Sequence, residues 1–84
     1  MKYSLSILPK AQKELSHFDD SSYGRVRDAI RELASNARPV GFAKLSGRDG
    51  WRIRVGNFRV IYEIDDAQKS VTVLHVGHRR DVYR

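Results

Sequence analysis

Cysteine is absent from the sequence, which excludes disulfide bonds, thiol catalysis and zinc sites built on cysteine thiolates. No run of residues approaches the roughly 20 consecutive apolar residues that a membrane helix needs. Residues 1–8 are too few and too polar for a secretory signal. These absences predict a cytoplasmic protein. A chain of 84 residues has room for one domain, which we expect to span residues 1–84.

Acidic residues are in the minority. The sequence has 16 lysines and arginines against 10 aspartates and glutamates, which gives a formal net charge of +6. Eleven of the 16 cations are arginines, whose planar guanidinium group binds phosphate through two donors at once. Because small basic domains of this kind often bind polyanions, the composition points to nucleic acid as the first class of partner.

The N-terminal half carries one strand pattern and two helix patterns. Residues 2–7 alternate between apolar and polar side chains, which predicts a strand. Apolar residues then recur at helical spacing in two segments, which predict helices at about 9–18 and 21–35. Pro9 suits the first turn of the first helix, and residues 19–22 supply turn and capping chemistry between the two. Each helix has a single apolar stripe, so the pair should form an antiparallel hairpin that packs against a sheet.

The C-terminal half is dominated by strand patterns. Residues 37–50 contain Pro39 and three glycines, and we expect a long connection there. Beyond it, period-two alternation predicts strands at 51–55 and 58–64, joined by a tight turn at Gly56-Asn57, and a covered central strand at 71–77. The expected fold is α+β with the order β-α-α-β-β-β. A helical hairpin would pack on one face of a small, mainly antiparallel sheet of four strands.

Three arginines share one face of the predicted hairpin. If Gly56 and Asn57 are the two loop residues, the apolar cross-strand pairs all fall on the opposite face, so the register is self-consistent. The first face then carries Arg52, Arg54 and Arg59, with Arg54 directly across from Arg59. Like charges at a cross-strand pair are destabilising. The pair therefore indicates either a solvated basic face or a site that binds an anion.

The end of the sequence adds further cations and an aromatic ring. Residues 77–84 are GHRRDVYR, a basic cluster followed by a tyrosine. Arginines along a groove, together with a ring on which a base can stack, are common in proteins that bind single-stranded RNA. The tail therefore favours RNA among the possible polyanions.

Three motifs together resemble the RelE branch of the RelE/ParE toxin superfamily. They are KLSG at 44–47, WRIRVGNFRVIY at 51–62 and VGHRRDVY at 76–83, and the expected element order fits the same family. The resemblance implies a toxin of a type II toxin–antitoxin system. It further implies a ribosome-dependent endoribonuclease that cleaves mRNA in the decoding site and inhibits translation. The implied reaction is attack by a ribose 2′-hydroxyl on the adjacent phosphate, which expels the 5′-oxygen.

The resemblance also implies catalytic roles for five residues of this chain. Arg52 and Arg54 match two basic positions that flank the 2′-oxygen, and Arg59 matches an arginine at the scissile phosphate. Arg79 matches an arginine at the leaving group, and Tyr83 a tyrosine stacked on a base. Around these residues we expect RNA contacts from four more: Lys44, Arg48, His78 and Arg80.

Two positions depart from the family, which often has lysine where this chain has Arg52 and Arg54. A guanidinium group does not deprotonate in proteins, so we expect both to stabilise the 2′-oxyanion and not to act as the base. Imidazole ordinarily exchanges protons near pH 7, so His78 is either a solvated or phosphate-contacting residue or a participant in proton transfer. His75 and His78 lie three apart and on opposite faces of one strand, so they make no metal pair. We expect neither a metal nor a cofactor.

The implied partners are mRNA, ribosomal RNA and a cognate antitoxin. The antitoxin is expected to be RelB-like, short, acidic and partly disordered, and no membrane partner is expected. Two other functions stay open: a ParE-type inhibitor of DNA gyrase, and a noncatalytic module that binds RNA or the ribosome through the same face. The joint presence of the five catalytic candidates favours the ribonuclease.

Overall fold

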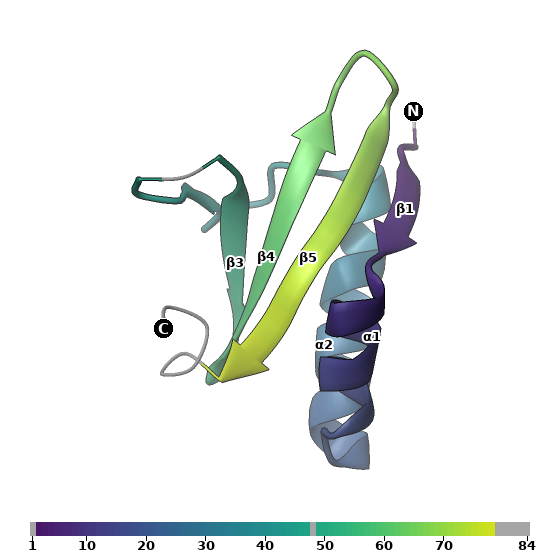
Figure 1. Ribbon diagram of the computed structural model, residues 1–84, viewed down its shortest axis with the longest axis vertical. Coiled ribbons are helices and arrows are strands. Elements are labelled where there is room, and N and C mark those ends of the chain that lie inside the picture. Colours follow the sequence, from purple (N-terminus) through teal and green to yellow (C-terminus); the bar gives the residue numbers. More distant parts are fainter. Residues whose placement is uncertain (1, 48, 79–84) are drawn as a thin grey trace.

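The computed structural model describes residues 2–47 and 49–78 (Figure 1). In these ranges two helices pack against a mixed sheet of five strands in the order β1-β5-β4-β3-β2. No helix of the described ranges is long and apolar enough to cross a membrane. The α+β class, the helical hairpin and the mainly antiparallel sheet agree with the prediction, whereas the number of strands does not.

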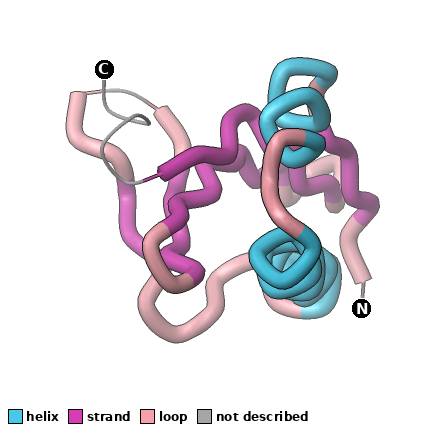
Figure 2. Tube along the Cα trace, turned by 90° about the horizontal axis from the view of Figure 1, so that it is seen from below, coloured by secondary structure: helices cyan, strands magenta, loops and turns pink. Residues whose placement is uncertain are grey.

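The two helices begin where their local sequence predicts. α1 (Pro9–Ser16) starts at Pro9. Backbone N–H groups in the first turn of a helix have no acceptor within the helix, so a proline there costs no hydrogen bond. α2 (Asp20–Ser35) is capped by Asp19, whose carboxylate accepts a hydrogen bond of 3.0 Å from the Ser22 N–H. Figure 2 looks nearly along both helices, which lie side by side next to the strands.

The sheet combines one parallel pair with an antiparallel meander. β1 (Ser4–Ile7) runs parallel to β5 (Ser70–His78), whose other edge pairs with β4 (Phe58–Asp65). β4 pairs in turn with β3 (Trp51–Val55), and β3 with the short β2 (Ala43–Lys44). The prediction of four strands is therefore wrong by one. β2 lies within 37–50, where two paired residues are too few to produce a visible alternation.

The β3–β4 hairpin has the predicted register. Gly56 and Asn57 form the turn between the strands, and Arg54 lies directly across from Arg59. Gly56 has a φ of 60°, which glycine adopts without strain. The apolar cross-strand partners face the helices and join the core, which consists of Ala11, Leu15, Val26, Ile30, Leu33, Ala37, Ile53, Val60, Tyr62, Val71, Val73 and Val76.

α1 also covers the part of the β5 edge that β1 leaves open. β1 stops at Ile7, across from Val73, so the rest of β5 needs other partners on that side. Glu14 supplies them: its Oε1 accepts a hydrogen bond of 2.9 Å from the Val76 N–H, and its Oε2 lies 2.5 Å from Nδ1 of His75. One carboxylate thus caps a strand edge that would otherwise present an unpaired donor.

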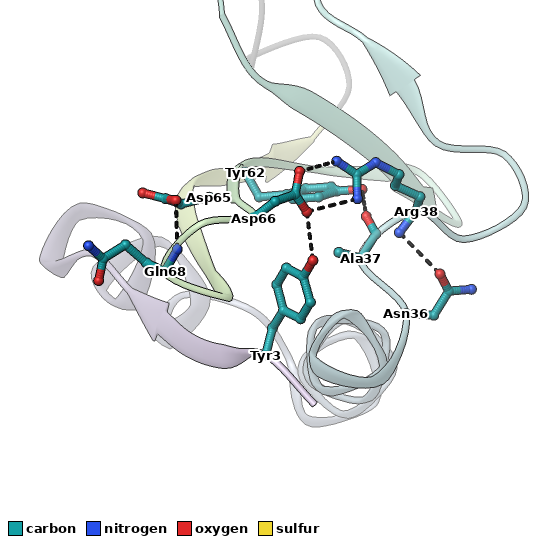
Figure 3. A network of polar contacts seen from close by, with 8 residues as sticks. All are labelled: Tyr3, Asn36, Ala37, Arg38, Tyr62, Asp65, Asp66 and Gln68. Atoms are coloured by element: carbon teal, nitrogen blue, oxygen red, sulfur yellow. Dashed lines mark hydrogen bonds and ion pairs between the residues drawn. The ribbon is translucent and has the colours of Figure 1, made fainter. Parts of the chain in front are cut away.

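A polar network joins three segments near the turn between β4 and β5 (Figure 3). Asp66 accepts hydrogen bonds from both terminal nitrogens of Arg38, at 2.8 and 3.2 Å, and from the Tyr3 hydroxyl at 2.6 Å. The bonds from Arg38, followed by that from Tyr3, hold the pKa of Asp66 below its ordinary value. Next to this group the Tyr62 hydroxyl donates to the Ala37 carbonyl at 2.9 Å. The network fixes the start of the long connection against the sheet.

Candidate functional site

The face of the sheet turned away from the core carries the predicted arginines. Cross-strand partners share a face, and the register places Arg54, Arg59 and Gly77 in one row across β3, β4 and β5. Arg59 is only 9% exposed, whereas Arg54 is an exposed residue. One guanidinium group is therefore held by its surroundings, and the other reaches into solvent from the neighbouring strand.

A small apolar cluster packs on the same face. Ile61 is 1% exposed and contacts Leu45 and Leu74, and it is the cross-strand partner of the half-buried Arg52. The cluster excludes water from the middle of the face. Because water screens charges strongly, the charges beside the cluster are screened less than they would be in open solvent. We refer to Arg52, Arg54 and Arg59 as the basic face.

The chemistry of the basic face suits a phosphate ligand. Guanidinium groups stay charged at physiological pH and offer forked donors that match phosphate oxygens. An anion bound between Arg54 and Arg59 would offset the repulsion expected between like charges at a cross-strand pair. Cations that are fixed before the ligand arrives stabilise negative charge without reorganisation. The burial of Arg59 meets that condition.

The two histidines of β5 lie on opposite faces of the sheet, as their spacing predicted. His75 lies on the side of the basic face, where Glu14 is in contact with its Nδ1. His78 is across from Phe58 and meets its ring edge-on, with centroids 6.0 Å apart. The structure therefore places His78 on the side of the helices and does not bring it to the basic face. Its contact with RNA stays a prediction.

Lys44 also lies apart from the basic face. Its Nζ is 5.2 Å from the centre of the Trp51 ring, a cation–π contact. Both residues line a cavity of about 570 Å³ whose lining includes four carboxylates, those of Asp49, Glu63, Asp65 and Asp66. Acidic surroundings of this kind disfavour phosphate, so the RNA contact predicted for Lys44 lacks support from its neighbours. The remaining candidates lie outside the described residues: Arg48, Arg79, Arg80 and Tyr83.

One arginine beside the β3–β4 turn could not be placed from the sequence. Arg25 extends from α2 to the β3–β4 turn, where a Cβ added to Gly56 would lie 3.0 Å from its Nη2. The two strands that leave this turn carry Arg54 and Arg59. The helical pattern places Arg25 beside the buried stripe of α2, but it does not show which part of the sheet the side chain reaches.

Comparison with known proteins shows which family the chain belongs to. Residues 5–83 match the family model of the ParE toxin of type II toxin–antitoxin systems. The chain belongs to this family. It is 48% identical over 90 residues to the toxin RelG of Mycobacterium tuberculosis, with 100% of this chain and 99% of the relative covered. It is 25% identical over 88 residues to the putative toxin RelE1 of Methanocaldococcus jannaschii, with 100% and 98% covered.

Solved structures of related toxins share the fold. A chain of the archaeal RelE–RelB complex from Pyrococcus horikoshii has a TM-score of 0.84 at 26% identity, with 96% of this toxin and 99% of that chain covered. The isolated E. coli RelE toxin has a TM-score of 0.77 at 26% identity, with 96% and 90% covered. The protein is thus a toxin of a type II toxin–antitoxin system in the RelE/ParE superfamily, as the three motifs indicated.

Proposed function

We propose that this toxin is an endoribonuclease that cleaves mRNA in the decoding site of the ribosome and thereby inhibits translation. The main observation in support of the proposal is that Arg54 and Arg59 lie directly across from one another. Arg59 is buried, whereas Arg54 is exposed. Membership in the RelE/ParE superfamily supports it. The toxin would act as a single domain in the cytoplasm, where its substrate is translated.

In the proposed reaction the ribose 2′-oxygen attacks the adjacent phosphorus while the bond from phosphorus to the 5′-oxygen breaks. The 2′-hydroxyl loses a proton and the departing 5′-oxygen gains one, which leaves a 2′,3′-cyclic phosphate and a 5′-hydroxyl. Such a displacement depends on positioning and on neutralisation of charge. Arg59 would neutralise the scissile phosphate. Arg52 and Arg54 would stabilise the 2′-oxyanion, because guanidinium groups do not act as bases.

Arg79 and Tyr83 complete the proposed site on the strength of the family resemblance. Arg79 would stabilise the departing oxygen, and Tyr83 would stack on a base next to the cut. Both lie outside the described residues. The geometry of the basic face therefore supports the phosphate and 2′-oxygen side of the reaction.

The proposed partner is a RelB-like antitoxin. RelE toxins related to this chain have been solved together with RelB from Pyrococcus horikoshii and from E. coli. A toxin with a net charge of +6 suits an acidic and partly disordered partner, because opposite charge speeds association and the partner orders as it binds.

The test is primer extension on a reporter mRNA in a purified translation system. We expect cuts within codons that form only when the message is translated, and upstream fragments that end in a cyclic phosphate. An mRNA that remains intact while protein synthesis stops would overturn the proposal, because the toxin would then block translation without cleavage.

The matching family model is named for ParE, and this favours inhibition of DNA gyrase as a second candidate. A supercoiling assay with purified gyrase separates the two functions. Loss of supercoiling with intact mRNA would indicate the gyrase inhibitor, whereas cut mRNA with unchanged supercoiling would indicate the ribonuclease.

A further inference from the structure

The side of the sheet that bears the basic face changes its charge along β4. Arg59 lies near the β3–β4 turn, Ile61 follows two residues later, and the exposed Glu63 two residues after that. Residues two apart in a strand share a face. Beyond Glu63 lies the cavity of about 570 Å³, whose lining includes four carboxylates: Asp49, Glu63, Asp65 and Asp66. An RNA strand on the basic face would therefore be repelled from this end of the sheet.

The two edges of the sheet also carry carboxylates. Glu14 lies at the edge of β5, where it accepts a hydrogen bond from the Val76 N–H. A groove of about 650 Å³ lies beside β3, and its lining beyond the basic face includes Glu32 and the exposed Val40. Neither a carboxylate nor an aliphatic side chain donates a hydrogen bond to phosphate. The end of the sheet at the β3–β4 turn differs, because Arg25 lies there.

Contact with the turn holds Arg25 at this end. A Cβ added to Gly56 would lie 3.0 Å from Nη2 of Arg25, 3.5 Å from its Cζ and 3.6 Å from its Nη1. The guanidinium group therefore lies against the glycine, in space that another residue would fill. Arg25 is exposed, and no carboxylate of the described residues forms an ion pair with it. Its charge is available to a ligand.

Arg25 is close enough to the basic face for one ligand to contact both. Arg54 precedes Gly56 by two residues, which span about 7 Å of an extended strand. Arg25 comes from a helix on the core side of the sheet, whereas Arg54 belongs to the opposite face. The exposed His78 lies at the same end on the core side, as the cross-strand partner of Phe58 (Figure 1). A single RNA strand that bends around the turn would meet donors on both faces.

We propose that Arg25 binds a backbone phosphate of the RNA substrate beside the cleaved bond, where the strand passes around the β3–β4 turn. The basic face would bind the scissile phosphate, and Arg25 a phosphate one or two nucleotides away, through the forked donors of its guanidinium group. This inference rests on the proposed function for its ligand, but it concerns binding and not the chemical step. Glycine at position 56 would serve this site by leaving room for Arg25.

The first test measures binding of a short oligoribonucleotide by fluorescence anisotropy. The probe is centred on the codon at which the toxin cuts or stalls translation, with 2′-deoxy nucleotides in that codon so that it stays intact. We expect Arg25→Gln to bind it roughly threefold to tenfold more weakly, as for one charged contact at a surface. The slope of log affinity against log salt should become less steep by about 0.7, the value for one phosphate of a single strand.

Arg31→Gln is the matched control, because it removes the same charge from another exposed position of α2. It should bind the probe within about twofold of the wild type, since long-range attraction is screened by salt. Equal losses in Arg25→Gln and Arg31→Gln would show that only the net charge matters, and would exclude the site.

The second test replaces one phosphate of the probe at a time with an uncharged methylphosphonate. At one position beside the cut the wild type should lose affinity, whereas Arg25→Gln should lose little more, because it has already lost that contact. If Arg25 acted only by stabilising the turn, its effect would be the same at every phosphate. That result, or wild-type affinity in Arg25→Gln, would overturn the proposal.

Gly56→Asn displaces the guanidinium group but keeps its charge. Asparagine tolerates the left-handed φ of 60° at this position, so the turn should keep its shape. Its Cβ would lie 3.0 Å from Nη2 of Arg25, and the end of that flexible side chain has to move. We expect the same loss of affinity as in Arg25→Gln, with an unchanged melting temperature. Wild-type affinity in Gly56→Asn would contradict the position of the site.

The remaining outcomes separate this site from its alternatives. Weaker binding of Arg25→Gln to ribosomes without mRNA, with unchanged affinity for the probe, would assign Arg25 to ribosomal RNA and exclude our proposal. A wild type that cleaves mRNA but shows no coupling to any phosphate, or no affinity for the probe at low salt, would overturn the site alone. A wild type that shows the coupling but leaves mRNA intact would overturn the ribonuclease and support the site.

Discussion

At the scale of single residues, burial determines the chemistry of Tyr62. Its side chain is fully buried, and its hydroxyl donates to the Ala37 carbonyl. Loss of solvation raises the pKa of Tyr62 to about 12 from an ordinary value of 10.0, because the phenolate is disfavoured in the core. The pKa of Tyr62 is higher in the folded protein than in the unfolded chain. Its full contribution to the free energy of unfolding is therefore present below pH 10, and this contribution is lost as the pH rises toward 12.

We expect Tyr62→Phe to lower the free energy of unfolding by about 1 kcal/mol at neutral pH, through the loss of one buried hydrogen bond. Between pH 10 and 12 the variant should lose less stability than the wild type. Chemical denaturation followed by circular dichroism measures both effects. Tyr23→Phe, at a residue 39% exposed, is the control and should keep the wild-type decline. An undiminished decline in Tyr62→Phe would show that another group titrates.

The positions of the arginines were predictable from the sequence, but their burial was not. Alternation along the hairpin was sufficient to place Arg54 across from Arg59, because each apolar pair fixes the face of its neighbours. Alternation does not indicate that Arg59 is buried, since burial depends on segments that are distant in the sequence. Lys44 and His78 were expected to contact RNA because they belong to the KLSG and VGHRRDVY motifs, whereas cross-strand pairing places both away from the basic face.

At the scale of elements, Glu14 connects α1 to β5. Its carboxylate contacts the Val76 N–H and the His75 ring, and the side chains of Glu14 and His75 are 24% and 17% exposed. We expect Glu14→Ala to lower the free energy of unfolding by roughly 1–3 kcal/mol, because a shielded donor loses its acceptor. Glu14→Gln keeps an oxygen for the Val76 N–H and should lose less.

Urea denaturation measures these differences. Glu32→Ala is the matched control, because it removes an acidic side chain from an exposed position of α2. If Glu14→Ala and Glu32→Ala proved equally stable, the contact between α1 and the edge of β5 would contribute nothing to folding.

Elements with a strong periodic pattern were predictable, and short or irregular ones were not. Both helices and the β3–β4 hairpin follow from apolar spacing and from the Gly56-Asn57 turn. β2 has two residues, and its pairing with β3 depends on how the long connection folds back. The register shift that leaves Leu74 without a cross-strand partner in β4 has no signature in the alternation of β5, which is apolar on both faces.

At the scale of the whole molecule, the fold separates packing from chemistry. The helices lie on one side of the sheet (Figure 1) and bury the core there. The register of the hairpin places the basic face on the other side. In the proposed function, a net charge of +6 would attract RNA from a distance, and the fixed arginines would then bind one phosphate at short range. In this account, the overall charge affects binding, whereas the basic face affects the rate of cleavage.

The most direct test compares the cleavage rate at one mapped codon for the wild type, Arg54→Ala and Arg31→Ala. Each variant removes one exposed arginine, from the basic face in the first and from α2 in the second. We predict that Arg54→Ala cleaves roughly 10²–10³-fold more slowly, as expected when a fixed donor to a developing oxyanion is lost. Arg31→Ala should cleave near the wild-type rate, with similar melting temperatures for all three. Near-wild-type cleavage by Arg54→Ala, or equal losses in the two variants, would contradict the account.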